Sequence, residues 1–172
     1  MRIRNFLFAA LIAVAGFGTQ LQAQKIASID MDRILTSITE YQDAQEQLDQ
    51  LAAKWQQEIN QQYDQIKGMY NKYQAEQVLL SEEQQAQREE EIIAKEKAVR
   101  DLQRERFGPE GALFQRRQEL VKPIQDAVYE AVENYANTRG YDFIFDRAGS
   151  AGIIFSSDTY DKTDDILRAL RN

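Results

Sequence analysis

Apolar residues recur at alternating steps of three and four along residues 38–80, which is the spacing of a coiled-coil seam. The pattern predicts one long helix, which would extend about 63 Å if it runs from Ile38 to Leu79. Two rows of residues seven apart form the seam, and three of their positions are polar. The rows are Ile38, Gln45, Ala52, Ile59, Ile66, Tyr73 and Leu80, and Tyr41, Leu48, Trp55, Gln62, Met69 and Glu76.

A helix-start signal follows this seam and predicts that the chain reverses near residues 80–82. Ser81 and Gln84 have the spacing of a capping box, and Glu82 and Glu83 would oppose the helix dipole in the first turn. The alternative is a single uninterrupted helix in which Ser81 is incidental. We favour the reversal because the strand-like segments at both ends of the helical region must meet to form a sheet.

The returning helix is expected to be interrupted. Residues 82–106 are heavily charged and thinly apolar, and residues 107–111 (Phe-Gly-Pro-Glu-Gly) predict a break or kink, because Pro removes a backbone donor and both Gly residues weaken a helix. Pro123 is expected to bend the helix again, and Gly140 to end it as a left-handed cap. A clearer heptad row runs between these points: Phe107, Phe114, Val121, Val128 and Tyr135.

Short apolar segments flank the helical region and predict a small sheet. Residues 25–30 and 141–146 have the pattern of strands, and residues 153–155 are expected to return as the hairpin partner of 141–146. An amphipathic helix should follow over residues 161–170. Because a lone strand is not stable in water, the helical region must leave the sheet and come back. The predicted fold class is α+β, with a small β-sheet body and a long protruding antiparallel helical hairpin.

The body is small, and this predicts association of several copies. We expect residues 24–37 and 121–172 to form the body and residues 38–120 to form the arm. The strands and the last helix together comprise roughly fifty residues, a size at which domains are marginal alone and often oligomerise. We therefore expect a homo-oligomer. The residues expected in the core of the body or oligomer are Ile26, Ile29, Phe143, Phe145, Ile153 and Phe155.

Residues 1–23 have the pattern of a cleaved secretory signal peptide. Arg2 and Arg4 precede an uncharged apolar run over residues 6–18, and Ala23 offers a small residue at the cut. The alternative is a membrane anchor, but the run is shorter than the ~20 residues that a spanning helix needs. The chain has no Cys, which excludes lipoprotein attachment and disulfides. Loss of Arg2 and Arg4 changes the net charge from −7 to −9, which disfavours general binding of nucleic acid.

Candidate catalytic residues are scarce. The chain contains neither His nor Cys, which removes the usual catalytic triads, thiol catalysis and most transition-metal sites. Asp30-Met31-Asp32 has the spacing of phosphoryl-transfer aspartates, but Asp30 is better interpreted as the cap of a helix that begins near Met31. The turn with Gly149 and Gly152 lacks the Lys-Ser/Thr of a phosphate-binding loop. We expect no enzymatic activity, no cofactor and no metal.

The order of these segments resembles the Skp/OmpH family of periplasmic chaperones along essentially the whole mature chain. The resemblance rests on residues 25–35, the long helical excursion, residues 140–146 and the closing residues 161–167. No single motif among them is specific, but their order and spacing together are. Residues 107–125 resemble one branch of that family.

The resemblance implies both an assembly and a function. Three small sheets would form a trimeric, barrel-like body, and three helical arms would surround a cavity. Unfolded outer membrane proteins would be held there without ATP and kept from aggregating in the periplasm. Some members have basic arms suited to acidic lipid, whereas this chain is acidic. No lipopolysaccharide site is therefore inferred, and contact with a membrane is left open.

Five large side chains of the arm are candidate client contacts, because flexible arms with Met and aromatic side chains can contact many sequences. They are Trp55, Tyr63, Met69, Tyr70 and Tyr73. Tyr73 falls on a seam row, as do Ile59 and Ile66, and is better explained by packing. Tyr63 and Tyr70 lie off both rows and are the stronger candidates. The alternative function is an architectural coiled-coil protein that tethers or spaces envelope components, with stiff arms and one constant partner.

Overall fold

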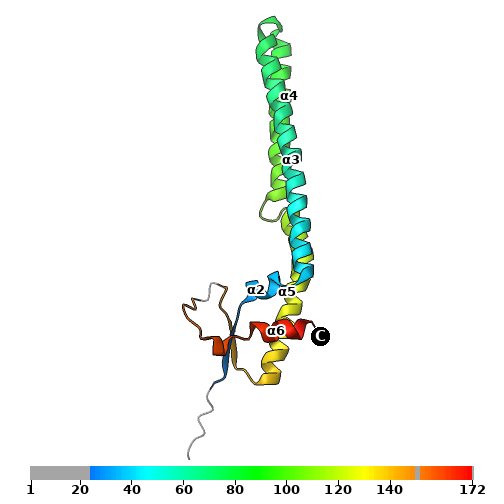
Figure 1. Cartoon of the computed structure of the whole chain (residues 1–172). Coiled ribbons are helices and arrows are strands. Elements are labelled where there is room, and N and C mark those ends of the chain that lie inside the picture. The colour runs from blue at the N-terminus through cyan, green and yellow to red at the C-terminus, as the bar shows by residue number, and fades with distance from the viewer. Residues whose placement is uncertain (1–23, 150–151, 172) are drawn as a thin grey trace, which may run out of the picture.

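The chain folds into a small body from which one long helical arm projects (Figure 1). The computed structural model describes residues 24–149 and 152–171, so the predicted signal peptide over residues 1–23 lies outside the described residues. Helices with one small sheet form the described part, as predicted. The elements are β1 (Ile26–Ile29), α2 (Met31–Thr36), α3 (Thr39–Glu76), α4 (Glu82–Phe107), α5 (Ala112–Arg139), β2 (Phe143–Asp146) and α6 (Thr163–Leu170), with 3₁₀ turns at Gln77–Leu79 and Asp158–Tyr160.

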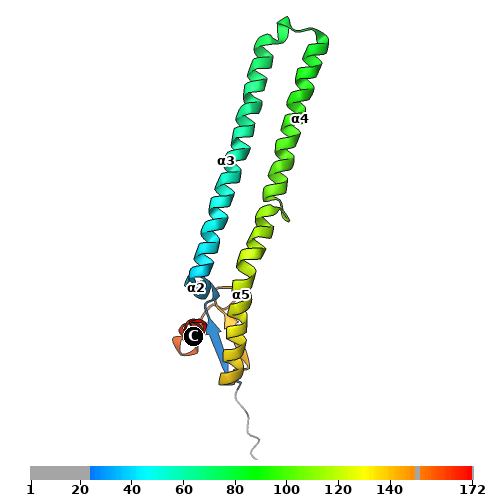
Figure 2. The ribbon, with the colours of Figure 1, turned by 90° about the vertical axis from the view of Figure 1, so that its right-hand side faces the viewer.

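The arm is an antiparallel helical hairpin, with α3 on one side and α4 followed by α5 on the other. α3 forms one side and has 38 residues, which gives a length of about 57 Å. α4 and the first part of α5 return beside it (Figure 2). The rest of α5 continues into the body, where Val128 is part of the core. The boundary expected near residue 120 thus falls inside a continuous helix.

The chain reverses at the tip of the arm, directly after the 3₁₀ turn. The Ser81 hydroxyl accepts a hydrogen bond from the Gln84 N–H at 3.3 Å, and the Gln84 side-chain oxygen accepts one from the Ser81 N–H at 3.1 Å. These two bonds are the predicted capping box. Glu82 and Glu83 occupy the first turn of α4, where a negative charge is favourable. The predicted reversal is confirmed.

The returning side of the arm is broken between Phe107, the last residue of α4, and Ala112, the first residue of α5. A Cβ atom on Gly108 would lie 2.4 Å from a carbonyl oxygen of the preceding turn, and one on Gly111 would lie 2.8 Å from another. Both positions therefore need glycine, and the predicted break is confirmed. α5, by contrast, remains one helix through Pro123.

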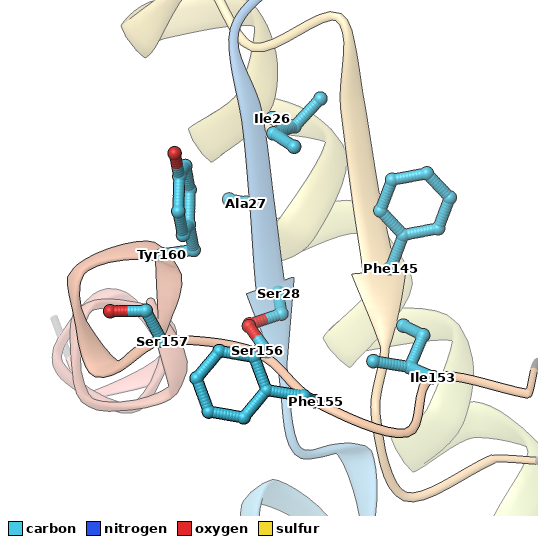
Figure 3. Close-up of a pocket in the computed structure, with 9 residues that line it drawn as sticks. All are labelled: Ile26, Ala27, Ser28, Phe145, Ile153, Phe155, Ser156, Ser157 and Tyr160. Atoms are coloured by element: carbon cyan, nitrogen blue, oxygen red, sulfur yellow. The ribbon is translucent and has the colours of Figure 1, made fainter.

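β1 and β2 pair in parallel, with Ile26 opposite Phe143. Parallel strands need a long crossover connection, and here the whole arm is that connection. The predicted excursion from the sheet is confirmed, but the predicted hairpin is wrong, because residues 153–155 form no strand beside β2. The Ser156 hydroxyl lies 2.8 Å from the Ser28 hydroxyl. This hydrogen bond places the segment across the face of the sheet that carries Ser28, rather than along the edge of β2 (Figure 3).

The core of the body lies between the sheet and the helices at the foot of the arm. Ile144 on β2 faces this core, whereas Phe143 and Phe145 face the other way, as the alternation of a strand requires. The helices thus cover one face of the sheet only. The buried residues of the core are Ile29, Ile34, Leu35, Val128 and Ile166.

Two predicted helix ends of the body are confirmed. Asp30 caps α2, and its carboxylate accepts a hydrogen bond from the Arg33 N–H at 2.9 Å. Gly140 ends α5 with a φ of 67°, the left-handed conformation that glycine adopts without steric strain. Both caps lie next to the sheet, so they set the directions in which the chain enters and leaves the arm.

Candidate functional site

Two buried apolar clusters hold the sides of the arm together. The basal cluster joins α3 to α5 through Ala44, Leu48 and Val121. The distal cluster joins α3 to α4, and the residues that α3 contributes to it lie on a predicted seam row, which confirms the helical periodicity. The distal cluster consists of Ile59, Ile66, Tyr73, Ile92 and Val99.

Trp55 packs against the last turn of α4, next to the break. Its ring meets Phe107 edge to face, with ring centres 6.2 Å apart. The Arg106 guanidinium lies 4.5 Å from the centre of the Trp55 ring. The Arg106 Nε atom is buried and has no hydrogen-bond partner among the described residues, so the ring is its main stabilising neighbour. Trp55 is itself buried and stabilises the arm.

Tyr73 connects the two sides of the arm near the tip. Its hydroxyl donates a hydrogen bond to the Glu89 carboxylate and accepts one from the Gln77 amide at 3.2 Å. The bond to Glu89 raises the pKa of the Tyr73 hydroxyl, and burial adds to this effect. The side chain is buried, so its role in a single chain is to hold α3 and α4 together.

Tyr63 and Tyr70 are the accessible members of the five candidate client contacts. Their exposed fractions are 41% and 48%, respectively. They lie two turns apart on α3, about 10.5 Å along the helix axis. The Tyr63 hydroxyl donates a long hydrogen bond of 3.4 Å to the Gln103 side chain of α4. Met69, in contrast, is partly buried against the distal cluster.

Exposed apolar side chains that the sequence analysis did not single out lie in the outer part of the arm. Val78 and Leu79, in the 3₁₀ turn at the tip, have exposed fractions of 90% and 83%, and Ile93 on α4 has 61%. The exposure of Ile93 could have been expected from the sequence, because Ile92 is also apolar and directly precedes it. Adjacent residues on a helix point in different directions, so only one of the pair can join the seam.

The outer face of the sheet is largely apolar, and among the described residues only the segment with Ile153, Phe155 and Ser156 crosses it (Figure 3). The Phe143 and Phe145 rings stack with their centres 6.1 Å apart. Beside Phe145 lies a hollow of about 310 Å³, whose lining includes Ile26, Ile153 and Phe155. Of the six residues expected in the core of the body or oligomer, Ile29 is buried within the chain and Ile153 is partly buried. The exposed ones are Ile26, Phe143, Phe145 and Phe155.

Carboxylates gather where the strands end, and they are engaged in structural bonds. Arg147 lies 3.6 Å from the Asp30 carboxylate and 2.9 Å from that of Asp161. Although burial alone would raise it, the pKa of Asp161 is lowered by hydrogen bonds from Thr163 and by the charge of Arg147. The described residues contain no group of three or more Asp, Glu, His or Cys arranged to hold a metal ion.

The match to a known family covers both the body and the arm. Residues 25–170 match the family described as outer membrane protein (OmpH-like). The chain belongs to the OmpH-like family. No curated protein matches the chain.

The OmpH-like fold is also found in a solved structure. The crystal structure at 2.83 Å resolution of a candidate outer membrane chaperone (OmpH-like) from Caulobacter crescentus CB15 is similar with a TM-score of 0.68. The similarity covers 86% of this chain and 84% of that chain, at 12% sequence identity. At this identity the likeness establishes the fold of the arm and body.

Two groups of exposed apolar side chains are the candidate functional surfaces of this OmpH-like chain. One is the outer face of the sheet, and the other runs along the outer arm. Within residues 24–149 and 152–171, no helix is both long and apolar enough to cross a membrane.

Proposed function

We propose that the chain is an ATP-independent holdase chaperone of the periplasm, which binds unfolded outer membrane proteins and prevents their aggregation. The observation that carries this proposal is the arm, a slender two-helix projection with accessible aromatic side chains. Membership of the OmpH-like family supports it, as does the shared fold with a candidate outer membrane chaperone.

We place the client in a cavity between three arms of a homotrimer. The exposed outer face of the sheet supports this assembly, because three copies would bury Ile26, Phe143, Phe145 and Phe155 against one another. A two-stranded sheet is also marginal alone, and an unpaired edge of β2 favours pairing with another chain. The three joined sheets would form the barrel-like body.

Tyr63 and Tyr70 are the side chains that we assign to direct client contact. Both are accessible, and Tyr offers a large apolar ring with one polar end, which suits contact with many sequences. Trp55, Met69 and Tyr73 would act mainly by keeping the sides of the arm together, because each packs within it.

Dilution of a urea-unfolded β-barrel protein, followed by light scattering, tests the holdase. The mature chain should suppress scattering without ATP and at less than one trimer per client. Tyr63→Ser/Tyr70→Ser should weaken the suppression, whereas Tyr129→Ser, which removes an exposed ring from α5, should not. No suppression at a threefold excess of trimer would contradict the proposal. Cross-linking in cells to one constant partner, rather than to many clients, would favour an architectural tether.

A further inference from the structure

The outer part of the arm has an excess of carboxylates over basic groups. Residues 70–96 contain seven Glu but only three basic residues, Lys72, Arg88 and Lys95. Ion pairs in this part of the arm engage Glu91 and Glu96. Among the described residues, no ion pair is formed by Glu82, Glu83 and Glu90. Part of the negative charge of this region is therefore available to a partner.

A shallow hollow of about 210 Å³ with both apolar and polar lining, here called the distal groove, lies between α3 and α4 in this acidic region. Ile92 and Tyr73 belong to the buried distal cluster, whereas Tyr70 and Ile93 are exposed. The groove is lined by Tyr70, Tyr73, Glu89, Ile92, Ile93 and Glu96.

The two glutamates of the distal groove are seven residues apart on α4, which separates them by about 10.5 Å along the axis. Glu89 accepts a hydrogen bond from the Tyr73 hydroxyl at one carboxylate oxygen, Oε1. Glu96 forms an ion pair with Arg100, with 3.5 Å between Glu96 Oε2 and the guanidinium. Each carboxylate therefore has a second oxygen that can accept a hydrogen bond from a cation.

We propose that the distal groove binds client segments in which a large apolar residue is flanked, two positions away on each side, by Lys or Arg. In an extended segment, alternate side chains point the same way, and the two flanking residues lie about 13 Å apart. The flexible stem of Lys can span the difference between this distance and the separation of Glu89 and Glu96. The apolar side chain then fills the hollow while the cations pair with the carboxylates.

This inference rests on the proposed holdase function and names the class of segment that the arm prefers. Exposed ion pairs contribute little individually and are screened by salt, so one groove binds weakly. Three arms on one body would strengthen the binding of a long client through avidity. Weak contacts of this kind also allow a client to leave without ATP.

Fluorescence anisotropy with three labelled peptides tests the proposal, each peptide carrying three repeats of a five-residue unit. The units are Lys-Ser-Phe-Ser-Lys, Glu-Ser-Phe-Ser-Glu and Lys-Ser-Ser-Ser-Lys. The first peptide should bind about tenfold more tightly than the other two, and this advantage should shrink as NaCl rises from about 50 to 300 mM. Equal binding of the three peptides, or no binding of the first, overturns the proposal.

Matched variants locate the effect. Glu89→Gln/Glu96→Gln keeps the side-chain shape but removes two charges, and it should abolish most of the advantage of the lysine–phenylalanine peptide. Glu40→Gln/Asp43→Asn removes two exposed charges at the base of the arm and should leave the advantage intact. If both variants lose the peptide's binding advantage equally, the advantage comes from net charge, and the proposed binding at the distal groove is overturned.

The holdase assay separates this inference from the proposed function. If the chain suppresses β-barrel aggregation but shows no preference among the peptides, only the proposed role of the distal groove is overturned. Absence of suppression together with absence of peptide binding overturns both.

Discussion

The guanidinium of Arg106 lies 4.5 Å from the centre of the Trp55 ring, one residue before α4 ends. The Phe107 ring packs against the Trp55 ring at nearly a right angle, so the last two residues of α4 both contact α3. The returning side of the arm can therefore break at Gly108 without losing its alignment. The unbroken α3 supports two shorter helices, α4 and α5.

Trp55→Ala should lower the free energy of unfolding by about 3 kcal/mol, because it removes a buried ring and its contacts with Arg106 and Phe107. Urea unfolding followed by circular dichroism, at one fixed protein concentration, measures the change. Gln57→Ala, on the exposed side of the same helix, should change the value by no more than about 0.5 kcal/mol. Equal effects would contradict the packing role of Trp55.

Gly108→Ala and Gly68→Ala should have opposite effects on thermal stability. A Cβ atom on Gly108 would collide with a backbone oxygen at 2.4 Å, so the break must distort, at a cost of about 1–3 kcal/mol. Gly68 lies within α3 with nothing within 4 Å of the added atom, and Ala there should stabilise the arm by up to about 1 kcal/mol. Calorimetry of both variants checks the signs, and stabilisation by Gly108→Ala would refute the tight break.

Acid should destabilise the contact between α5 and α6. Tyr135 donates a hydrogen bond of 2.7 Å to Asp165, and this bond, helped by Arg168, lowers the pKa of Asp165 from 3.8. A carboxyl with a lowered pKa contributes stability that is present above its unfolded value and lost as pH falls through its folded value. Asp165→Asn should therefore show a smaller drop in melting temperature below about pH 4 than the parent chain.

Alkaline pH should also destabilise the contact between α5 and α6, because Tyr135 then loses its proton. Burial, with the hydrogen bond to Asp165, raises the pKa of Tyr135 above its usual 10.0. The resulting stability is fully present below that value and is lost as pH rises toward the folded pKa. Tyr135→Phe should remove this alkaline loss, and melting curves above pH 10 measure it. An unchanged alkaline profile in the variant would contradict the assignment.

Phe143→Ser/Phe145→Ser should convert the proposed trimer into monomers, because it removes the stacked rings from the outer face of the sheet. Tyr129→Ser, on an exposed part of α5, is the matched control and should leave the mass unchanged. Light scattering on a sizing column gives the mass of each variant. A parent chain that is already monomeric at micromolar concentration would contradict the trimer.

Local features of the arm could be predicted from the sequence. The capping box of Ser81 and Gln84, the break after Phe107 and the left-handed Gly140 all appear where they were expected. Each depends on residues within a few positions of one another, and the interaction that forms them is present in any helix with that sequence. The seam rows of α3 were likewise predictable, because burial follows helical periodicity. Phe114, which lies on the row predicted for the returning helix, is instead exposed.

The contacts of the body could not be predicted in the same way. Residues 153–155 have the composition of a strand, yet they form no strand of the sheet. The Ser156 hydroxyl that follows them is hydrogen-bonded to the Ser28 hydroxyl of β1. The outer face of the sheet carries Phe143 and Phe145, which are exposed in the single chain and form a patch of the kind that marks an interaction site. Composition indicates apolar strands but does not indicate which face the helices cover.

The sequence alone was sufficient for the approximate lengths of the helices, the place where the arm reverses and the caps at its ends, because these depend on neighbours along the chain. Only the tertiary structure decided that β1 and β2 pair in parallel, that Arg106 covers Trp55, and that Phe143 and Phe145 face away from the core of the body. Those outcomes depend on residues that lie tens of positions apart and meet only after the arm has closed on itself.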